Sequence, residues 1–228
     1  MINGKRVLAI TLARGGSKGV YKKNISDLNG MPLLKYTTDE IKKSKYIDQY
    51  IVSTDDKDIS DFCHNKAFVN TFDRDEASDI QSSAEALLEV LKSVNEFDYV
   101  IEIMCTNPLK SVEDIDGVIE KLDSTGADSV VSVARIWDHH PSRVKYIESD
   151  KLVDFYPEIP ESRRQDLTPA AYVRNGSIYA MTYEQLNTNE TRLGKDTIPY
   201  IMPEERTINI DEPIDLKLAE LMLFERSI

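Results

Sequence analysis

The chain has 228 residues, a formal net charge of −12 and 41% hydrophobic residues, a composition that argues against a disordered chain and against a general nucleic-acid binder. No apolar stretch approaches the ~20 residues of a membrane-spanning helix, and the first residues lack the apolar region of a signal peptide. The two distant cysteines, Cys63 and Cys105, predict free thiols, and we therefore expect a single cytoplasmic domain with no nucleic-acid or membrane partner.

Short apolar runs alternate with amphipathic segments along the first part of the chain. Strands are predicted at 6–12, 49–54, 68–71, 99–104 and 128–134, and helices at 32–43, 55–67, 82–94 and 113–122. This alternation is typical of an α/β protein with a mostly parallel sheet, in which ligands bind at the carboxyl ends of the strands. The loops 13–23, 53–56 and 105–110 all follow strands, so we expect them to form one site.

The pattern changes after Arg135. Residues from about 136 to 170 combine several prolines with short extended runs, and they are interpreted as a β-rich arm inserted into a single domain that spans 1–228. Further strands are predicted at 172–182 and 197–202, and the Asn175-Gly176 pair is a strong turn signal. A final helix is expected to bury an apolar face that consists of Ile214, Leu218, Leu221 and Met222.

The loop LARGGSKG, Leu12–Gly19, concentrates positive charge in an otherwise acidic protein. The first 26 residues contain six lysines and arginines and no acidic residue. Gly15 and Gly16 allow bare backbone N–H groups to approach an anion, and Arg14 and Lys18 can bind phosphate oxygens. The spacing matches neither a Walker A loop nor G-x-G-x-x-G. A phosphate site is the favoured interpretation, and an ordinary glycine turn with solvated cations is the alternative.

Two acidic motifs could bind a metal ion. Asn209 and Asp211 are two residues apart, so on a strand their side chains would lie on one face and could hold Mg²⁺ through oxygen atoms. Asp211 could equally be the N-cap of the final helix, and the two roles are compatible. Asp55 and Asp56 also follow a strand, where a helix N-cap is favoured over a metal site.

The motifs taken together resemble one enzyme family. LARGGSKGVYKKNI, IVSTDD, TNPLK, GADSVVSV, RRQDL, RNGSIY and INIDEPID occur in this order along nearly the whole chain. This set resembles the acylneuraminate cytidylyltransferases, also called CMP-sialic acid synthetases, and it is compatible with a CMP-legionaminic acid branch.

The resemblance implies a Rossmann-like nucleotidyltransferase fold and a homodimer in which the arm reaches the partner subunit. It implies that CTP and a nine-carbon 2-keto-3-deoxy sugar acid react, with Mg²⁺ or Mn²⁺, to give a CMP-sugar and pyrophosphate. The anomeric hydroxyl would attack the α-phosphate directly, without a covalent enzyme intermediate.

The same resemblance assigns roles to individual residues. The nucleotide would be bound by Ala13, Arg14, Gly15, Gly16, Ser17, Lys18, Lys23, Asn24, Arg74 and Ser82. The sugar acid would be bound by Thr106, Asn107, Arg164, Gln165, Asn175 and Tyr179. The metal would be held by Asp211 and Asn209, and Arg14, Lys18 and Asp211 would be the catalytic residues.

Two positions depart from the family pattern. Met104 and Cys105 stand where the family usually has Gln-Pro, which leaves the acceptor open. Asn209 stands where the family usually has an aspartate, which removes one negative charge from the metal site. A Kdo-type or other sugar nucleotidyltransferase, and a non-catalytic nucleotide-binding homologue, therefore remain as alternatives.

Overall fold

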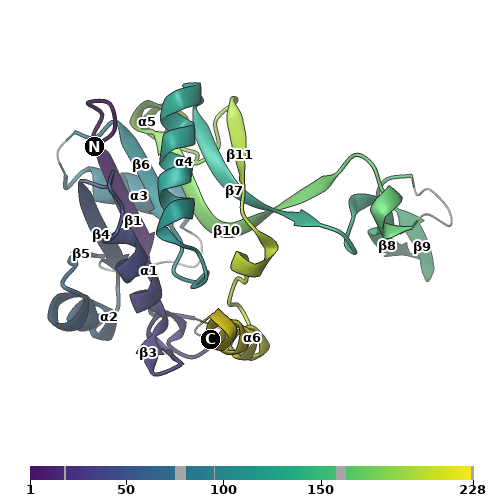
Figure 1. The fold of residues 1–228 in the computed structure, drawn as a ribbon, viewed down its shortest axis with the longest axis horizontal. Coiled ribbons are helices and arrows are strands. Elements are labelled where there is room, and N and C mark those ends of the chain that lie inside the picture. Colours follow the sequence, from purple (N-terminus) through teal and green to yellow (C-terminus); the bar gives the residue numbers. More distant parts are fainter. Residues whose placement is uncertain (18, 75–80, 95, 158–162, 227–228) are drawn as a thin grey trace.

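The structure is a computed structural model, and it describes residues 1–17, 19–74, 81–94, 96–157 and 163–226. A seven-stranded sheet with the order β11-β7-β10-β6-β1-β4-β5 forms its centre (Figure 1). The strands are β1 (Val7–Leu12), β4 (Gln49–Thr54), β5 (Asn70–Asp73), β6 (Tyr99–Ile103), β7 (Ser129–Ile136), β10 (Ala171–Thr182) and β11 (Thr197–Ile201). Strand β10 runs antiparallel to both of its neighbours, and all other pairs are parallel. The predicted α/β class with a mostly parallel sheet is therefore confirmed.

Helices cover both faces of this sheet. They are α1 (Leu33–Ile41), α2 (Lys57–Phe62), α3 (Ser83–Leu91), α4 (Val112–Thr125) and α5 (Tyr183–Asn189). The last helix, α6 (Pro213–Arg226), contacts residues 27–28 instead. Local sequence fixes where several begin: Pro32 precedes α1, Ser82 and Glu85 form a capping box at α3, and Asp56 caps α2 through the N–H groups of Asp58 and Ile59. The helix N-cap interpretation of Asp56 is thus confirmed.

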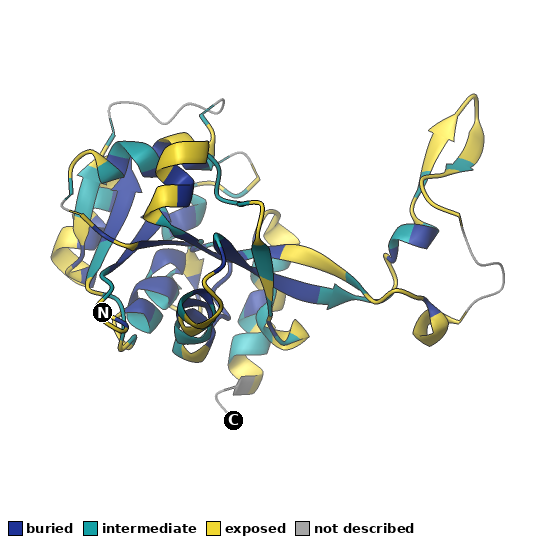
Figure 2. Ribbon diagram, turned by 90° about the horizontal axis from the view of Figure 1, so that it is seen from above, coloured by how far each residue is buried: buried dark blue, intermediate teal, exposed yellow. Residues whose placement is uncertain are grey.

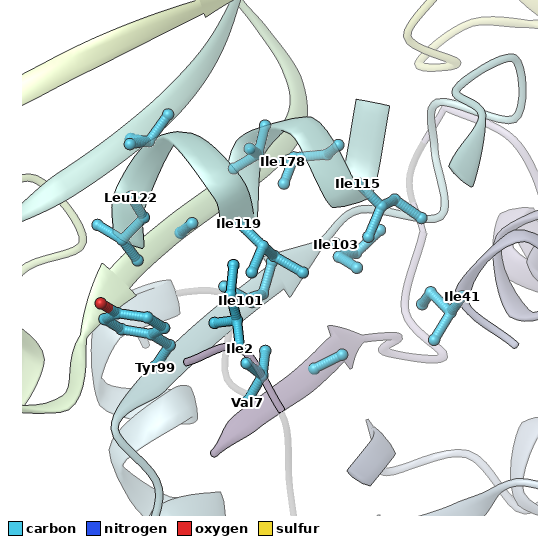
Figure 3. Packing of buried hydrophobic residues seen from close by; sticks show 14 residues of the cluster. Ile2, Val7, Ile41, Tyr99, Ile101, Ile103, Ile115, Ile119, Leu122 and Ile178 are labelled. Carbon is cyan, nitrogen blue, oxygen red and sulfur yellow. The ribbon is translucent and has the colours of Figure 1, made fainter. Parts of the chain in front are cut away.

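Two hydrophobic clusters lie on opposite faces of the sheet. Figure 3 shows the first, in which Ile101 and Ile103 of β6 and Ile178 of β10 pack against Ile115 and Ile119 of α4. In the second, Leu8 and Ile10 of β1 pack with Leu87 of α3 and Leu186 of α5. Burial on both faces explains why the central strands are continuous apolar runs rather than alternating ones.

The strand predicted at 172–182 is confirmed, but the turn signal of Asn175-Gly176 does not interrupt it with a hairpin. Both residues lie inside β10, where the pairing register with β7 shifts between Arg174 and Tyr179. Gly176 has a φ of +62°, so the turn-forming preference of the pair is used for an irregularity within a long strand. The predicted strand at 68–71 also begins later, at Asn70.

A long arm projects from the sheet (Figure 2). Strands β7 and β10 pair out to Ile136 and Ala171, and the hairpin of β8 (Lys145–Glu148) and β9 (Lys151–Asp154) lies beyond them. Its apolar residues include Ile147 and Leu152, which are 75% and 76% exposed. This hairpin falls within the segment of about 136–170 that the sequence analysis interprets as an arm, of which residues 158–162 lie outside the described part.

The predicted buried face of the last helix is wrong. In α6 the side chains of Ile214, Leu218 and Leu221 are exposed, Met222 is partly buried, and Ala219 is buried instead. Ala219 clusters with Ile210, with Leu28 and with Leu33 at the start of α1. Leu28 belongs to the short hairpin formed by β2 (Asp27–Leu28) and β3 (Met31–Pro32), next to α6 in Figure 1. Within the described residues, no helix has the length and apolarity needed to cross a membrane.

Candidate nucleotide and acceptor site

The loops that follow β1, β4 and β6 meet at one edge of the sheet, as expected. The Gly15 N–H donates to the Asp55 carboxylate at 2.8 Å, which joins the first loop to the second. The Cys105 thiol donates to the Asn24 side-chain oxygen at 3.1 Å, which joins the third loop to the first. The Asn24 amide in turn donates to the Arg14 carbonyl at 2.9 Å. These contacts hold the glycine loop against its neighbours.

A cavity of about 420 Å³ opens between these loops. Most of the predicted nucleotide-binding side chains that the structure describes line it: Arg14, Ser17, Lys23, Asn24, Arg74 and Ser82. Burial lowers the pKa of Arg74, whose Nε atom is buried without a hydrogen-bond partner among the described residues. An unpaired guanidinium N–H and a group of cations in one cavity suit an anionic ligand.

A second cavity of about 480 Å³ adjoins the first. Gly176 and Asn209 line both cavities, so the two spaces meet at these residues. Tyr179 and Asn175, two predicted sugar-binding residues, line the second cavity together with Arg174 and Arg192. The arrangement offers one polar space for a nucleotide and another, with two arginines, for an anionic acceptor.

Asn209 and Asp211 lie side by side at this junction. The Asn209 amide donates to the Asp211 carboxylate at 2.6 Å, and Lys23 donates to the same carboxylate at 2.9 Å. The segment is not a strand, contrary to expectation; the Ile210 N–H donates to the Thr106 carbonyl at 2.7 Å and fixes it in place. The predicted N-cap role of Asp211 is also not seen, because α6 begins at Pro213 and the Asp211 carboxylate accepts from Lys23 and Asn209 instead. Asp215 accepts the N–H groups of Asp211 and Glu212.

The chemistry of these side chains fits a divalent cation that is shared with phosphate oxygens. Asp211 offers a carboxylate and Asn209 an amide oxygen, and Mg²⁺ is usually bound by one or two protein oxygens together with substrate phosphates. No group of three or more His, Cys, Asp or Glu that could hold a metal ion occurs in the described part of the chain. A metal site formed by protein ligands alone is therefore not indicated.

The buried side chain of Lys110 holds the loop after β6 in place. Its ammonium is buried and donates to the Thr37 hydroxyl at 2.7 Å, to the Met104 carbonyl at 2.8 Å and to the Asn107 carbonyl. Burial lowers the pKa of Lys110 to about 7, and it raises the pKa of Cys105 to about 11. Lys110 thereby fixes the loop that carries Thr106, which lines the first cavity.

Sequence reasoning missed an ion pair between the two cavities. Glu102 of β6 is fully buried and lines the first cavity, and its Oε2 accepts from Arg192 Nη1 at 2.6 Å. The Arg192 guanidinium also lies 4.2 Å from the centre of the Tyr179 ring. Burial raises the pKa of Glu102, while Arg192 and Ser83 oppose the increase. The one available signal was a lone glutamate inside the apolar run 99–104.

Other predicted residues do not line either cavity or are not described. Ala13 is buried, and its N–H donates to the Ser53 carbonyl. Gly16 has open space at its Cβ position, with no atom within 4 Å, and Lys18 lies outside the described residues. Asn107 is buried beside the first cavity's Thr106, but it does not line either cavity.

Arg164 and Gln165 are exposed in the arm. There Arg164 pairs with Asp138 at 3.4 Å and lies over the Trp137 ring. Neither residue lines the first or the second cavity.

Comparison with known proteins agrees with this geometry. The cytidylyltransferase family profile matches residues 8–220. The chain is 32% identical to a CMP-N,N′-diacetyllegionaminic acid synthase from Legionella pneumophila, over 96% of both chains. It is 30% identical to an N-acylneuraminate cytidylyltransferase B from Danio rerio, over 93% of this chain and 50% of that protein.

A solved structure shares the fold. The structure of a CMP:2-keto-3-deoxy-manno-octonic acid synthetase complexed with CTP superposes with a TM-score of 0.71 at 19% identity, over 97% of this chain and 99% of that one. Fold, loop arrangement and sequence similarity lead to the same conclusion, which is that the chain belongs to the cytidylyltransferase family.

Proposed function

We propose that this protein transfers CMP from CTP to a nine-carbon 2-keto-3-deoxy sugar acid and releases pyrophosphate. N-acetylneuraminic acid and N,N′-diacetyllegionaminic acid are the acceptors favoured by the relatives named above. The observation that carries the proposal is the junction of the two cavities at Gly176 and Asn209, with Asp211 beside it. A phosphate at that junction would face the nucleotide space on one side and the acceptor space on the other.

The proposed reaction is an in-line displacement at the α-phosphate of CTP. The anomeric oxygen of the acceptor forms a bond to the α-phosphorus, the bond to the β-phosphate oxygen breaks, and pyrophosphate leaves. Such chemistry depends mainly on positioning and on neutralising the phosphate charge. In this proposal Arg14, Lys18 and Lys23 supply positive charge to the triphosphate, and Tyr179 and Arg174 border the space that orients the acceptor.

A Mg²⁺ or Mn²⁺ ion is part of the proposal. When bound, it would neutralise charge on the triphosphate, and Asp211 and Asn209 are the residues proposed to hold it. Lys23 already contacts the Asp211 carboxylate, so the ammonium group can orient this carboxylate towards the phosphates.

The arm suggests a homodimer. Its apolar side chains Ile147, Leu152, Phe155 and Tyr156 are exposed in a single protomer, and burial against a partner would remove them from water. Arg164 and Gln165 would then reach the partner's acceptor cavity rather than their own. We place the enzyme in the cytoplasm, a compartment that suits its two buried free thiols.

The proposal is tested by pyrophosphate release from CTP with N,N′-diacetyllegionaminic acid in wild type, Arg14→Ala and Lys18→Ala. Each substitution should reduce kcat/KM by about 100-fold or more, because charge on the transferring phosphoryl group is no longer neutralised. Lys57→Ala is the matched control, since Lys57 is exposed and pairs with Asp61 on the surface of α2. Normal turnover in the Arg14 and Lys18 variants would contradict the role of the glycine loop.

A further inference from the structure

Glu102 differs from an ordinary structural ion pair in one respect. Its side chain is fully buried, and Arg192 Nη1 donates to Oε2 at 2.6 Å. The other oxygen, Oε1, is buried and has no hydrogen-bond partner among the residues that the structure describes. A buried carboxylate oxygen without a donor is costly, because its hydration has been lost and not replaced. Because Glu102 lines the first cavity, a donor on a ligand bound there could complete the hydrogen bonding of this carboxylate.

A second buried pair in the same protein shows what a purely structural arrangement looks like. Asp114 is also fully buried, and both of its oxygens accept from Arg206, at 2.7 and 2.8 Å. The Ser111 N–H donates to it as well. The two arginines are exposed to a similar degree, 25% for Arg206 and 24% for Arg192. The Asp114 carboxylate therefore has donors on both oxygens, whereas Oε1 of Glu102 has none among the described residues.

The position of the Glu102 pair points to the acceptor rather than to the nucleotide. Glu102 of β6 lies directly opposite Tyr179 of β10 in the antiparallel register, so their side chains are neighbours on one face of the sheet. Arg192 lies over the Tyr179 ring, and both residues line the second cavity. Glu102 itself lines the first cavity, so the pair spans the wall between the two spaces.

We propose that Glu102 and Arg192 form a specificity-determining subsite for the acceptor. Oε1 of Glu102 accepts a hydrogen bond from a neutral donor on the sugar acid, a hydroxyl or the N–H of an acylamino group. Arg192 holds the carboxylate in place through Oε2 and keeps the subsite electrically neutral, so that the acceptor's own carboxylate is not repelled. This subsite rests on the function proposed above and adds to it the contact that selects among acceptors.

Glu102→Gln tests the subsite with little change in shape. Because Arg192 Nη1 requires an acceptor, the Gln carbonyl oxygen takes the place of Oε2 and the NH₂ group takes the place of Oε1. The cavity then presents a donor where the wild type presents an acceptor, and the substrate's donor is left unpaired. With N,N′-diacetyllegionaminic acid as the probe, the acceptor KM should rise by about tenfold or more. The KM for CTP should stay within about twofold.

A series of acceptor analogues, each lacking one hydroxyl or acylamino group, identifies which group of the sugar acid donates to Glu102. For the analogue that lacks the group bound by Glu102, wild type and Glu102→Gln should have the same acceptor KM, whereas the other analogues should keep the tenfold difference. Asp114→Asn is the matched control, because it alters an equally buried carboxylate that lines neither cavity. This variant should lower thermal stability and leave the acceptor KM unchanged. Arg192→Lys keeps the charge and provides a second variant if Glu102→Gln does not fold.

The outcomes separate this inference from the proposed function. If wild type turns over the acceptor and Glu102→Gln raises the KM for CTP instead, the subsite reads the nucleotide and the inference is wrong. An unchanged acceptor KM in folded Glu102→Gln and Arg192→Lys would also overturn it. If wild type releases no pyrophosphate with any sugar acid, the proposed function itself fails.

Discussion

Lys23 and Asp211 join the two ends of the chain at the site. The Lys23 ammonium donates to the Asp211 carboxylate at 2.9 Å and to the Ile210 carbonyl at 2.8 Å. Lys23 follows the glycine loop, and Asp211 precedes the last helix. Because Asp211 is 65% exposed, this pair contributes little to stability, and its value lies in orienting a carboxylate towards a ligand.

Asp211→Asn should therefore reduce activity much more than stability. We expect kcat to fall by about 100-fold, because the residue proposed to hold the metal beside the phosphates loses its charge. The free energy of unfolding should change by less than about 1 kcal/mol. Pyrophosphate release at saturating CTP and thermal unfolding measure the two effects. Asp58→Asn is the control, since Asp58 pairs with Lys22 at the surface, and it should keep full activity.

Asn209→Asp should strengthen metal binding. The Asn209 side chain lies 2.6 Å from the Asp211 carboxylate, so the variant places two carboxylates at one point, where they repel each other unless a cation lies between them. The Mg²⁺ concentration that gives half-maximal pyrophosphate release should fall several-fold, as a Mg²⁺ titration would show. A half-saturation point equal to or above that of wild type would exclude Asn209 from the metal site.

Gly19 and Gly16 should respond differently to alanine. A Cβ on Gly19 would lie 2.1 Å from the Asp211 carbonyl oxygen, so Gly19→Ala has to displace the segment that carries Asp211. A Cβ on Gly16 would meet nothing within 4 Å, so Gly16→Ala should fold as the wild type does. Thermal unfolding should show a loss of about 2 kcal/mol or more for Gly19→Ala alone. Equal stability of the two variants would mean that the close approach of the loops is not required.

The buried Lys110 predicts a dependence of stability on pH. Its folded-state pKa is about 7 against an ordinary 10.5, so between these values the unfolded chain binds a proton that the folded chain has released. The free energy of unfolding contributed by Lys110 therefore rises with pH across this window, and below about pH 7 the full cost of burying the charge is present. Lys110→Met removes this contribution together with three hydrogen bonds.

Urea unfolding at pH 6 and pH 9 measures the effect. The difference in unfolding free energy between wild type and Lys110→Met should be larger at pH 9 than at pH 6. An equal difference at both pH values would show that Lys110 keeps its proton in the folded protein throughout this range.

The sequence was informative where local pattern and chemistry coincide. Apolar runs such as Val7–Leu12 are buried on both faces of the sheet, and this pattern is typical of parallel strands. The loops that follow these strands converge because the strands run in one direction. The glycine loop was predicted as an anion site from its cations, and Arg14 does line the cavity.

Other features depend on tertiary context that a local pattern does not contain. Asn175-Gly176 suits a hairpin turn, but β10 continues through it because both of its neighbours pair with the strand on either side. The sequence pattern predicts that Ile214, Leu218 and Leu221 of α6 are buried, yet this helix contacts the domain through Ala219, Leu216 and Leu223. Glu102 and Arg192 are 90 residues apart, and only the register of β6 with β10 reveals their common location.

The most direct test of the account is pyrophosphate release by the wild-type enzyme from CTP and Mg²⁺ with a panel of acceptors. The panel contains N-acetylneuraminic acid, N,N′-diacetyllegionaminic acid and Kdo, and mass spectrometry identifies each product. We predict a CMP-sugar with one of the two nine-carbon acids and none with Kdo. Turnover of Kdo alone, or binding of CTP without turnover of any acceptor, would contradict the proposed function.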